Sequence, residues 1–143
     1  MIVNAATLAG KAQVLSGGKV ETDTIDVMNA LKFTYNAIEN EKDKLVAQIN
    51  VSSLGVDENI GNVTVNVYSY DENAIDLKIL SKCENSQSYI DVTEIALKKG
   101  WNKIVIPVTA FNCNNYGTLS VLRFNIGSMT QTEIAIGNIE IGG

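Results

Sequence analysis

Hydrophobic and polar residues alternate with a period of two along most of this chain. The segment 63–70 is the clearest case, because valines occupy its odd positions up to 67 and polar or aromatic residues occupy its even positions. Successive side chains of a strand point to opposite faces, so this spacing predicts β-strands with one buried face. The same pattern predicts strands over 31–36, 45–52, 75–79, 103–108, 122–126 and 134–141.

Polar turn-forming clusters separate these segments, at 39–44, 55–62, 71–73 and 112–117. The alternation changes phase at Gly137-Asn138, which predicts a β-bulge there. Pro107 falls inside a strand pattern and cannot donate to a ladder, so we expect it on a sheet edge or at a bulge. Only the segment 92–99 has helical character, and we expect one or two helical turns in it.

Amphipathic strands with almost no helix need a second sheet to cover their apolar face. We therefore predict an all-β fold, an antiparallel β-sandwich of the jelly-roll type. A chain of 143 residues fits one domain with a sizeable core. We expect residues 1–143 to form a single β-sandwich module.

The composition excludes several kinds of chemistry. The chain has no histidine, so Ser–His–Asp and Cys–His catalytic arrangements are impossible within it. Its formal net charge is −5 and its basic residues are scattered along the sequence, which disfavours nucleic acid and anionic membrane surfaces as partners. No segment is apolar enough over the length of a bilayer, so we expect no membrane insertion.

The two cysteines, Cys83 and Cys113, lack the CxxC spacing of a zinc site or a thioredoxin-type pair. They form either one disulfide in an exported protein or two separate thiols, and their spacing alone does not decide between these.

The C-terminal third of the sequence resembles a known family. The segment 98–108, which reads Lys-Lys-Gly-Trp-Asn and then an alternating strand with a late proline, resembles a segment of galactose-binding-like jelly rolls. These include carbohydrate-binding modules of bacterial glycoside hydrolases. The segments 119–126 and 136–141 are similar to their following and closing strands, although Gly137 stands where an aspartate is common. The resemblance implies a non-catalytic domain that holds a parent protein near a glycan, often with one structural calcium ion.

Sugar recognition needs aromatic faces for the apolar side of the ring, and amide, guanidinium or carboxylate groups for the hydroxyls. The outward positions of two predicted strands offer such groups, which form one polar-aromatic platform if the strands share a sheet. The ligand-binding candidates are Asn66, Tyr68, Tyr70, Arg123, Asn125 and Trp101. Two alternatives to this binding platform stay open. The tyrosines can occupy strand positions through their β-propensity alone, without a role in binding. A sugar can also bind to the loop aromatics Tyr89 and Tyr116 instead of the strands. In the resembling modules the tryptophan of this motif usually packs structurally.

Carboxylates are the remaining candidates for chemistry. Glu21, Asp23 and Asp26 cluster near the first strands, where the resembling modules sometimes hold calcium, and they form either a metal site or a solvated acidic face. A glycosidase needs two carboxylates facing each other in a cleft, whereas the acids here fall mostly in turns. We therefore expect no enzymatic activity.

Together, these features favour a non-catalytic carbohydrate-binding module from a larger secreted protein, located extracellularly or at a cell surface. The expected partners are a polysaccharide or glycan and a parent catalytic domain in the same chain. Residues 1–6 lack the pattern of a signal peptide, so either the protein is cytosolic or its leader lies outside this chain, and we expect the second. The alternative is a structural or protein-interaction β-sandwich without sugar affinity, such as a spacer, an adhesin or a phage receptor-binding domain.

Overall fold

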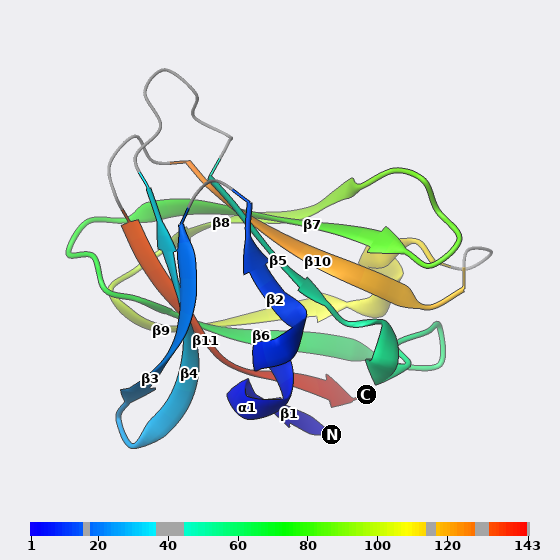
Figure 1. Ribbon diagram of the computed structural model, residues 1–143. Helices are drawn as coiled ribbons and strands as arrows, with labels where there is room; N and C mark the ends of the chain where they lie inside the picture. Colours follow the sequence, from blue (N-terminus) through cyan, green and yellow to red (C-terminus); the bar gives the residue numbers. More distant parts are fainter. Residues whose placement is uncertain (16–17, 37–44, 114–116, 128–131, 143) are drawn as a thin grey trace.

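The computed structural model describes residues 1–15, 18–36, 45–113, 117–127 and 132–142, which form two antiparallel sheets (Figure 1). Sheet A contains β1 (Ile2–Asn4), β3 (Lys19–Ile25), β4 (Met28–Tyr35), β6 (Asn62–Ser69), β9 (Gly100–Pro107) and β11 (Thr132–Gly142). Its strand order is β3-β4-β11-β6-β9, and β1 pairs with β11. Sheet B contains β2 (Ala12–Val14), β5 (Leu45–Asn50), β7 (Ile75–Cys83), β8 (Ile90–Leu97) and β10 (Leu119–Ile126), in the order β2-β5-β10-β7-β8. The predicted antiparallel β-sandwich is confirmed.

Helical structure in the described residues is limited to short connecting turns. The helix α1 (Ala5–Leu8) and the 3₁₀ turn η1 (Ala9–Lys11) lead from β1 to β2. Two further 3₁₀ turns, η2 (Ser52–Leu54) and η3 (Val108–Phe111), follow β5 and β9. In this described part of the chain, none of the helices is long and apolar enough to cross a membrane.

The helical turns expected over 92–99 do not form, because residues 92–97 belong to strand β8 and pair with β7. The register shifts at a bulge in β8, since Ile79 and Leu80 of β7 pair with Thr93 and Asp91 and leave Val92 as the extra residue. As a result, Val92 packs against the core as well as Ile95, three residues later. That spacing imitates the period of a helix in the sequence.

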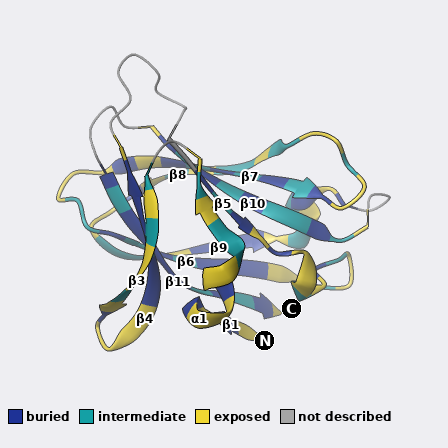
Figure 2. Cartoon of the chain, in the orientation of Figure 1, coloured by how far each residue is buried: buried dark blue, intermediate teal, exposed yellow. Residues whose placement is uncertain are grey.

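The core lies between the inward faces of the two sheets (Figure 2). Phe33 of β4 and Phe124 of β10 are fully buried, and their ring centroids lie 6.5 Å apart. The hydroxyl of buried Tyr35 donates a hydrogen bond to the Phe124 carbonyl oxygen at 3.3 Å, which satisfies a polar group that burial would otherwise leave without a partner. Full burial of a side chain of this size stabilises the fold by about 1.5–3 kcal/mol.

Two local predictions are confirmed at the edges and centre of sheet A. Pro107 is the last residue of β9, which is an edge strand, so its missing N–H costs no ladder hydrogen bond. The register between β11 and β6 shifts between Ile136 and Asn138, which makes Gly137 the extra residue of a bulge. β4 pairs with β11 before Gly137 and β1 pairs with it afterwards.

In the turn from β8 to β9, the glycine and the asparagine of the Gly-Trp-Asn motif each have a structural role. Gly100 has φ +95°, a conformation that glycine adopts without steric cost. The side chain of Asn102 accepts a hydrogen bond from the Lys98 backbone N–H at 3.1 Å and donates to the Lys98 carbonyl oxygen at 2.9 Å. The turn thereby fixes the start of β9 and the position of Trp101.

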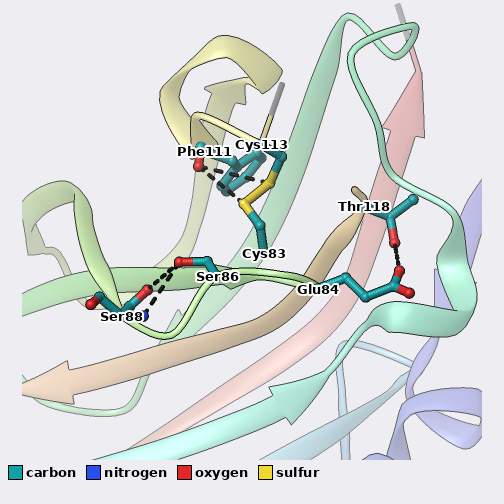
Figure 3. Close-up of a disulfide and its surroundings, with 7 residues drawn as sticks. All are labelled: Cys83, Glu84, Ser86, Ser88, Phe111, Cys113 and Thr118. Atoms are coloured by element: carbon teal, nitrogen blue, oxygen red, sulfur yellow. Dashed lines mark hydrogen bonds between the residues drawn. A yellow bond between two sulfur atoms is a disulfide. The ribbon is translucent and has the colours of Figure 1, made fainter. Parts of the chain in front are cut away.

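The two cysteines form a disulfide, which resolves the alternatives left open by the sequence (Figure 3). It joins the last residue of β7, Cys83, to Cys113, two residues after the end of η3. Both cysteines are buried. Beside the bridge, Thr118 donates a hydrogen bond to Glu84 at 2.9 Å.

The hairpin between β3 and β4 extends from sheet A and carries exposed residues at its tip (Figure 2). Its two-residue loop consists of Asp26 and Val27, with φ values of 51° and 61°. A type I′ loop needs positive φ at both positions and normally contains Asn-Gly or Asp-Gly. Val27 is fully exposed and β-branched, so this tip is strained.

Candidate functional site

The six ligand-binding candidates do not form one platform, because their strands belong to different sheets. Asn66 and Tyr68 lie on β6, Tyr70 directly follows it, and Trp101 lies on β9, all in or next to sheet A. Arg123 and Asn125 lie on β10 in sheet B. The neighbouring residues 65, 67, 122 and 124 are fully buried, so the half-buried candidates point outward from both sheets. The expected single face is wrong, and the structure offers two separate faces.

On sheet A, the three aromatic candidates pack against one another. The Tyr68 ring meets the rings of Tyr70 and Trp101 edge to face, with centroid distances of 5.0 and 5.2 Å. They cover a small second cluster that contains fully buried Ala30 and Ala135. These small residues leave room for the rings to lie directly on the sheet.

The bulge residue Gly137 also lies against the aromatic cluster, next to Trp101. A Cβ atom at Gly137 would lie 2.6 Å from Cη2 of Trp101, closer than real Cβ contacts come. The space that an aspartate would need at this position is therefore taken by the indole ring. The departure from the common aspartate of the resembling modules has a packing reason here.

The polar ends of two of these rings, Tyr70 and Trp101, already have partners. The Tyr70 hydroxyl donates to Asp23 at 2.8 Å, and Trp101 Nε1 donates to Asp26 at 3.2 Å. Burial and the hydrogen bond to Asp23 raise the pKa of Tyr70 above its ordinary value. The same hydrogen bond lowers the pKa of Asp23. A sugar on the aromatic cluster of sheet A would therefore have to compete with the hydrogen bonds that Tyr70 and Trp101 already make.

The three carboxylates expected to hold a metal are each engaged with a different donor. Asp23 and Asp26 accept the two hydrogen bonds from the aromatic cluster, and Glu21 forms ion pairs with Lys19 and Lys32 at 3.5 and 3.6 Å. Among the described residues, no group of three or more acidic or cysteine side chains is arranged to hold a metal ion. These residues do not fit a calcium site, and calcium binding stays a prediction that their arrangement does not support.

Lys32 and Glu133 of sheet A are also paired. Lys32 forms a second ion pair with Glu133 at 3.3 Å, and a hydrogen bond between the two raises the pKa of Lys32. A hollow of about 480 Å³ lies beside these residues and Tyr70. Asn66 is likewise engaged, since its amide donates to Asn138 at 2.5 Å and to Glu140 at 2.8 Å.

On sheet B, Arg123 occupies the centre of the outward face. It is in register with Gln48 of β5 on one side and Leu80 of β7 on the other. Its Nε donates a hydrogen bond to Gln48 Oε1 at 3.1 Å. Its guanidinium carbon lies 3.8 Å from the centroid of the Tyr89 ring, within the range of a cation–π contact. The planar guanidinium is therefore held in place by an amide and an aromatic ring.

Asn125, the other candidate on this strand, is in register with Lys78 of β7. Its Oδ1 is shielded from solvent and has no hydrogen-bond partner among the described residues. An unsatisfied acceptor of this kind costs about 1–3 kcal/mol, and functional sites are where such costs are commonly found.

Sequence reasoning missed Gln48 and treated Tyr89 only as an alternative. The signal was available for Tyr89, an aromatic residue in a predicted loop. Gln48 could have been found only by knowing which strand pairs with β10. Tyr116 lies outside the described residues.

We call the outward group formed by Gln48, Leu80, Tyr89, Arg123 and Asn125 the Arg123 face. It combines an aromatic ring, a fixed guanidinium, two amides and an apolar side chain, all half-buried. These are the groups that recognise the hydroxyls and the apolar side of a sugar ring. In contrast to the aromatic cluster of sheet A, much of its hydrogen-bonding capacity remains unused by the protein, because Nε is the only nitrogen of Arg123 with a hydrogen bond in the described structure.

No family model matches the sequence, and no curated protein matches it. The structure, however, matches solved structures along nearly its whole length. One is the CBM22-1 and GH10 modules of a Clostridium thermocellum endo-1,4-β-D-xylanase 10B complexed with xylohexaose, with a TM-score of 0.72 and 10% identity over 99% of this chain. This chain spans 28% of the length of that protein.

Two further similar structures are single modules. The CBM22-1 xylan-binding domain of a Paenibacillus barcinonensis enzyme has a TM-score of 0.69 and 12% identity, covering 99% of this chain and 92% of its own. A family 11 carbohydrate-binding module from Clostridium thermocellum, in complex with a β-1,3-1,4-mixed-linked tetrasaccharide, has a TM-score of 0.61 and 16% identity, covering 92% and 87%. At these identities the likeness establishes the fold alone, a β-sandwich that this chain shares with these structures.

Proposed function

We propose that this chain is a non-catalytic carbohydrate-binding module that binds a polysaccharide on the Arg123 face. The observation that carries the proposal is the arrangement of Arg123, stacked on Tyr89 and hydrogen-bonded to Gln48 at the centre of an open sheet. Such preorganisation lowers the entropic cost of binding, because the guanidinium does not have to be ordered by the ligand.

The structural neighbours support a glycan as the ligand. One is a xylan-binding domain, one is complexed with xylohexaose and one with a β-1,3-1,4-mixed-linked tetrasaccharide. One of them is joined to a GH10 module in the same chain. We extend the proposal to a parent glycoside hydrolase domain, which this module would hold near its substrate.

An extracellular location belongs to the same proposal. Disulfides form and persist in oxidising compartments and are rare in the cytosol. The bridge between Cys83 and Cys113 supports export of the protein.

Isothermal titration calorimetry against a panel of soluble polysaccharides tests the proposal. We expect binding to at least one polymer and an affinity at least tenfold lower for Arg123→Ala, since hydrogen bonds from a charged group contribute about 1.5–3 kcal/mol. Trp101→Ala on the opposite face is the matched control, and its affinity should stay unchanged while thermal unfolding shows that the variant is folded.

Two outcomes would contradict the proposal. Loss of binding in Trp101→Ala but not in Arg123→Ala would place the site on sheet A. Absence of binding across the panel would favour the alternative function, a structural or protein-interaction domain.

A further inference from the structure

Three cationic side chains lie together on the outward side of sheet B. Lys78 and Lys82 are on β7 and Arg123 is on β10, whose partner in register on β7 is Leu80. Each lysine is therefore a diagonal neighbour of Arg123, at roughly 7–8 Å between backbones in an antiparallel sheet. The fold gathers these charges although they are widely spaced in the sequence.

None of these three cations takes part in the ion pairs found among the described residues. The ion pairs found among the described residues involve Lys19, Lys32 and Lys99, which lie in sheet A or in the turn leading into it. The nearest acidic residues by register are Glu94, opposite Lys78, and Asp91, opposite Leu80. Both are exposed, and neither forms an ion pair with Lys78, Lys82 or Arg123 within 4.0 Å. The outward side of β7 also carries exposed Asp76. Arg123 is in register with Gln48 and Leu80, and Lys82 is in register with Val121 of β10, so no carboxylate lies directly beside these two cations in those pairings.

Two of the cations also converge on one aromatic ring. The Tyr89 centroid lies 3.8 Å from the guanidinium carbon of Arg123 and 5.8 Å from the ammonium nitrogen of Lys82. All three side chains are half-buried, so water screens their charges less than it would on an open surface. Like charges held this close repel each other, and an anion placed between them would relieve that repulsion.

We propose that the ligand of this surface is an anionic polysaccharide. Its carboxylate or sulfate groups would pair with Arg123 and the two lysines, and the apolar side of a sugar ring would lie against Tyr89 and Leu80. The planar guanidinium suits two oxygens of one anionic group, and the lysines act as point charges beside it. This inference rests on the proposed function and adds the chemical class of the glycan.

Matched pairs of polymers test the inference on the whole chain. Polygalacturonate is compared with its carboxyl-reduced neutral form, and carrageenan with its desulfated form, so that each pair differs in charge and the two pairs separate carboxylate from sulfate. We expect at least tenfold tighter binding to the charged member of one pair, with an affinity that falls as salt is added. Poly-L-glutamate, a polyanion without sugar rings, should bind at least tenfold more weakly.

The double variant Lys78→Gln and Lys82→Gln isolates the contribution of the lysines without altering Arg123. We expect it to lose at least tenfold in affinity for the charged polymer. The matched control is Lys98→Gln with Lys103→Gln, which removes the same charge from two exposed residues outside sheet B and should bind as the wild type does. Thermal unfolding of both variants confirms that they are folded.

The outcomes separate this inference from the proposed function. Equal or tighter binding to the neutral polymers would overturn the anionic ligand and leave the glycan-binding module intact. Equal binding to poly-L-glutamate, or an unchanged affinity in the Lys78 and Lys82 variant, would also overturn the inference. Absence of binding to every polysaccharide would remove both.

Discussion

Removing the disulfide is expected to reduce the stability of the module substantially. Replacement of Cys83 and Cys113 by alanine frees a loop closed over a sequence separation of 30 residues. The chain-entropy relation for a loop of this length gives a loss of about 3.6 kcal/mol in the free energy of unfolding at 25 °C. A small domain is typically stable by only about 5–15 kcal/mol, so the loss is a large share of the total.

Urea unfolding, followed by the fluorescence of Trp101, measures this loss, because Trp101 is the only tryptophan in the chain. The oxidised wild type is compared with the double variant and with the reduced wild type. Agreement between the last two within about 1 kcal/mol would assign the effect to the cross-link rather than to the substituted side chains. A loss below about 1 kcal/mol in the variant would refute the reasoning, since it would mean that the bridge hardly constrains the unfolded chain.

Three further predictions concern sheet A and the core. Gly137→Ala should displace Trp101, lower the free energy of unfolding by about 1–3 kcal/mol and shift the emission of the tryptophan, whereas Gly142→Ala on the same strand, with nothing within 4 Å of its Cβ, should do neither. Val27→Gly should raise the urea midpoint, with a gain of about 0.5–1 kcal/mol from relief of the positive φ, and a lower midpoint would contradict the strain described at the hairpin tip. Burial raises the pKa of Tyr35, so its contribution to stability is complete below its ordinary pKa of 10.0 and declines at higher pH; titration of the phenol absorbance should show ionisation of this group only together with unfolding.

Much of the fold could be predicted from the sequence, because the period of two reports directly on which side chains enter a core. The strands over 63–70 and 122–126, the bulge at Gly137 and the edge position of Pro107 follow from local chemistry alone. The prediction for the segment 92–99 was wrong because Val92, within that segment, is the extra residue of a bulge. The sequence of β8 alone does not distinguish the spacing of a bulged strand from that of a helix, since the bulge is defined by the pairing with β7.

The candidate site could be predicted only in part. The sequence places Arg123 and Asn125 on the outward side of their strand, because they alternate with buried residues. The structure confirms this outward position. Their assignment to the same face as Tyr68 required knowledge of which strands share a sheet, and this depends on long-range pairing. The same limit hid the group of three cations, since Lys78, Lys82 and Arg123 become neighbours only when β7 pairs with β10.

The central claim is that a glycan binds on the Arg123 face. Chemical-shift mapping of the backbone amides, during titration with an oligosaccharide of a polymer that binds, tests it most directly. The account predicts that the largest shifts fall on β5, β7 and β10 around Gln48, Leu80 and Arg123, while the amides of Tyr68 and Trp101 remain unchanged. Shifts concentrated on Tyr68 and Trp101 instead, with Arg123 unaffected, would contradict it.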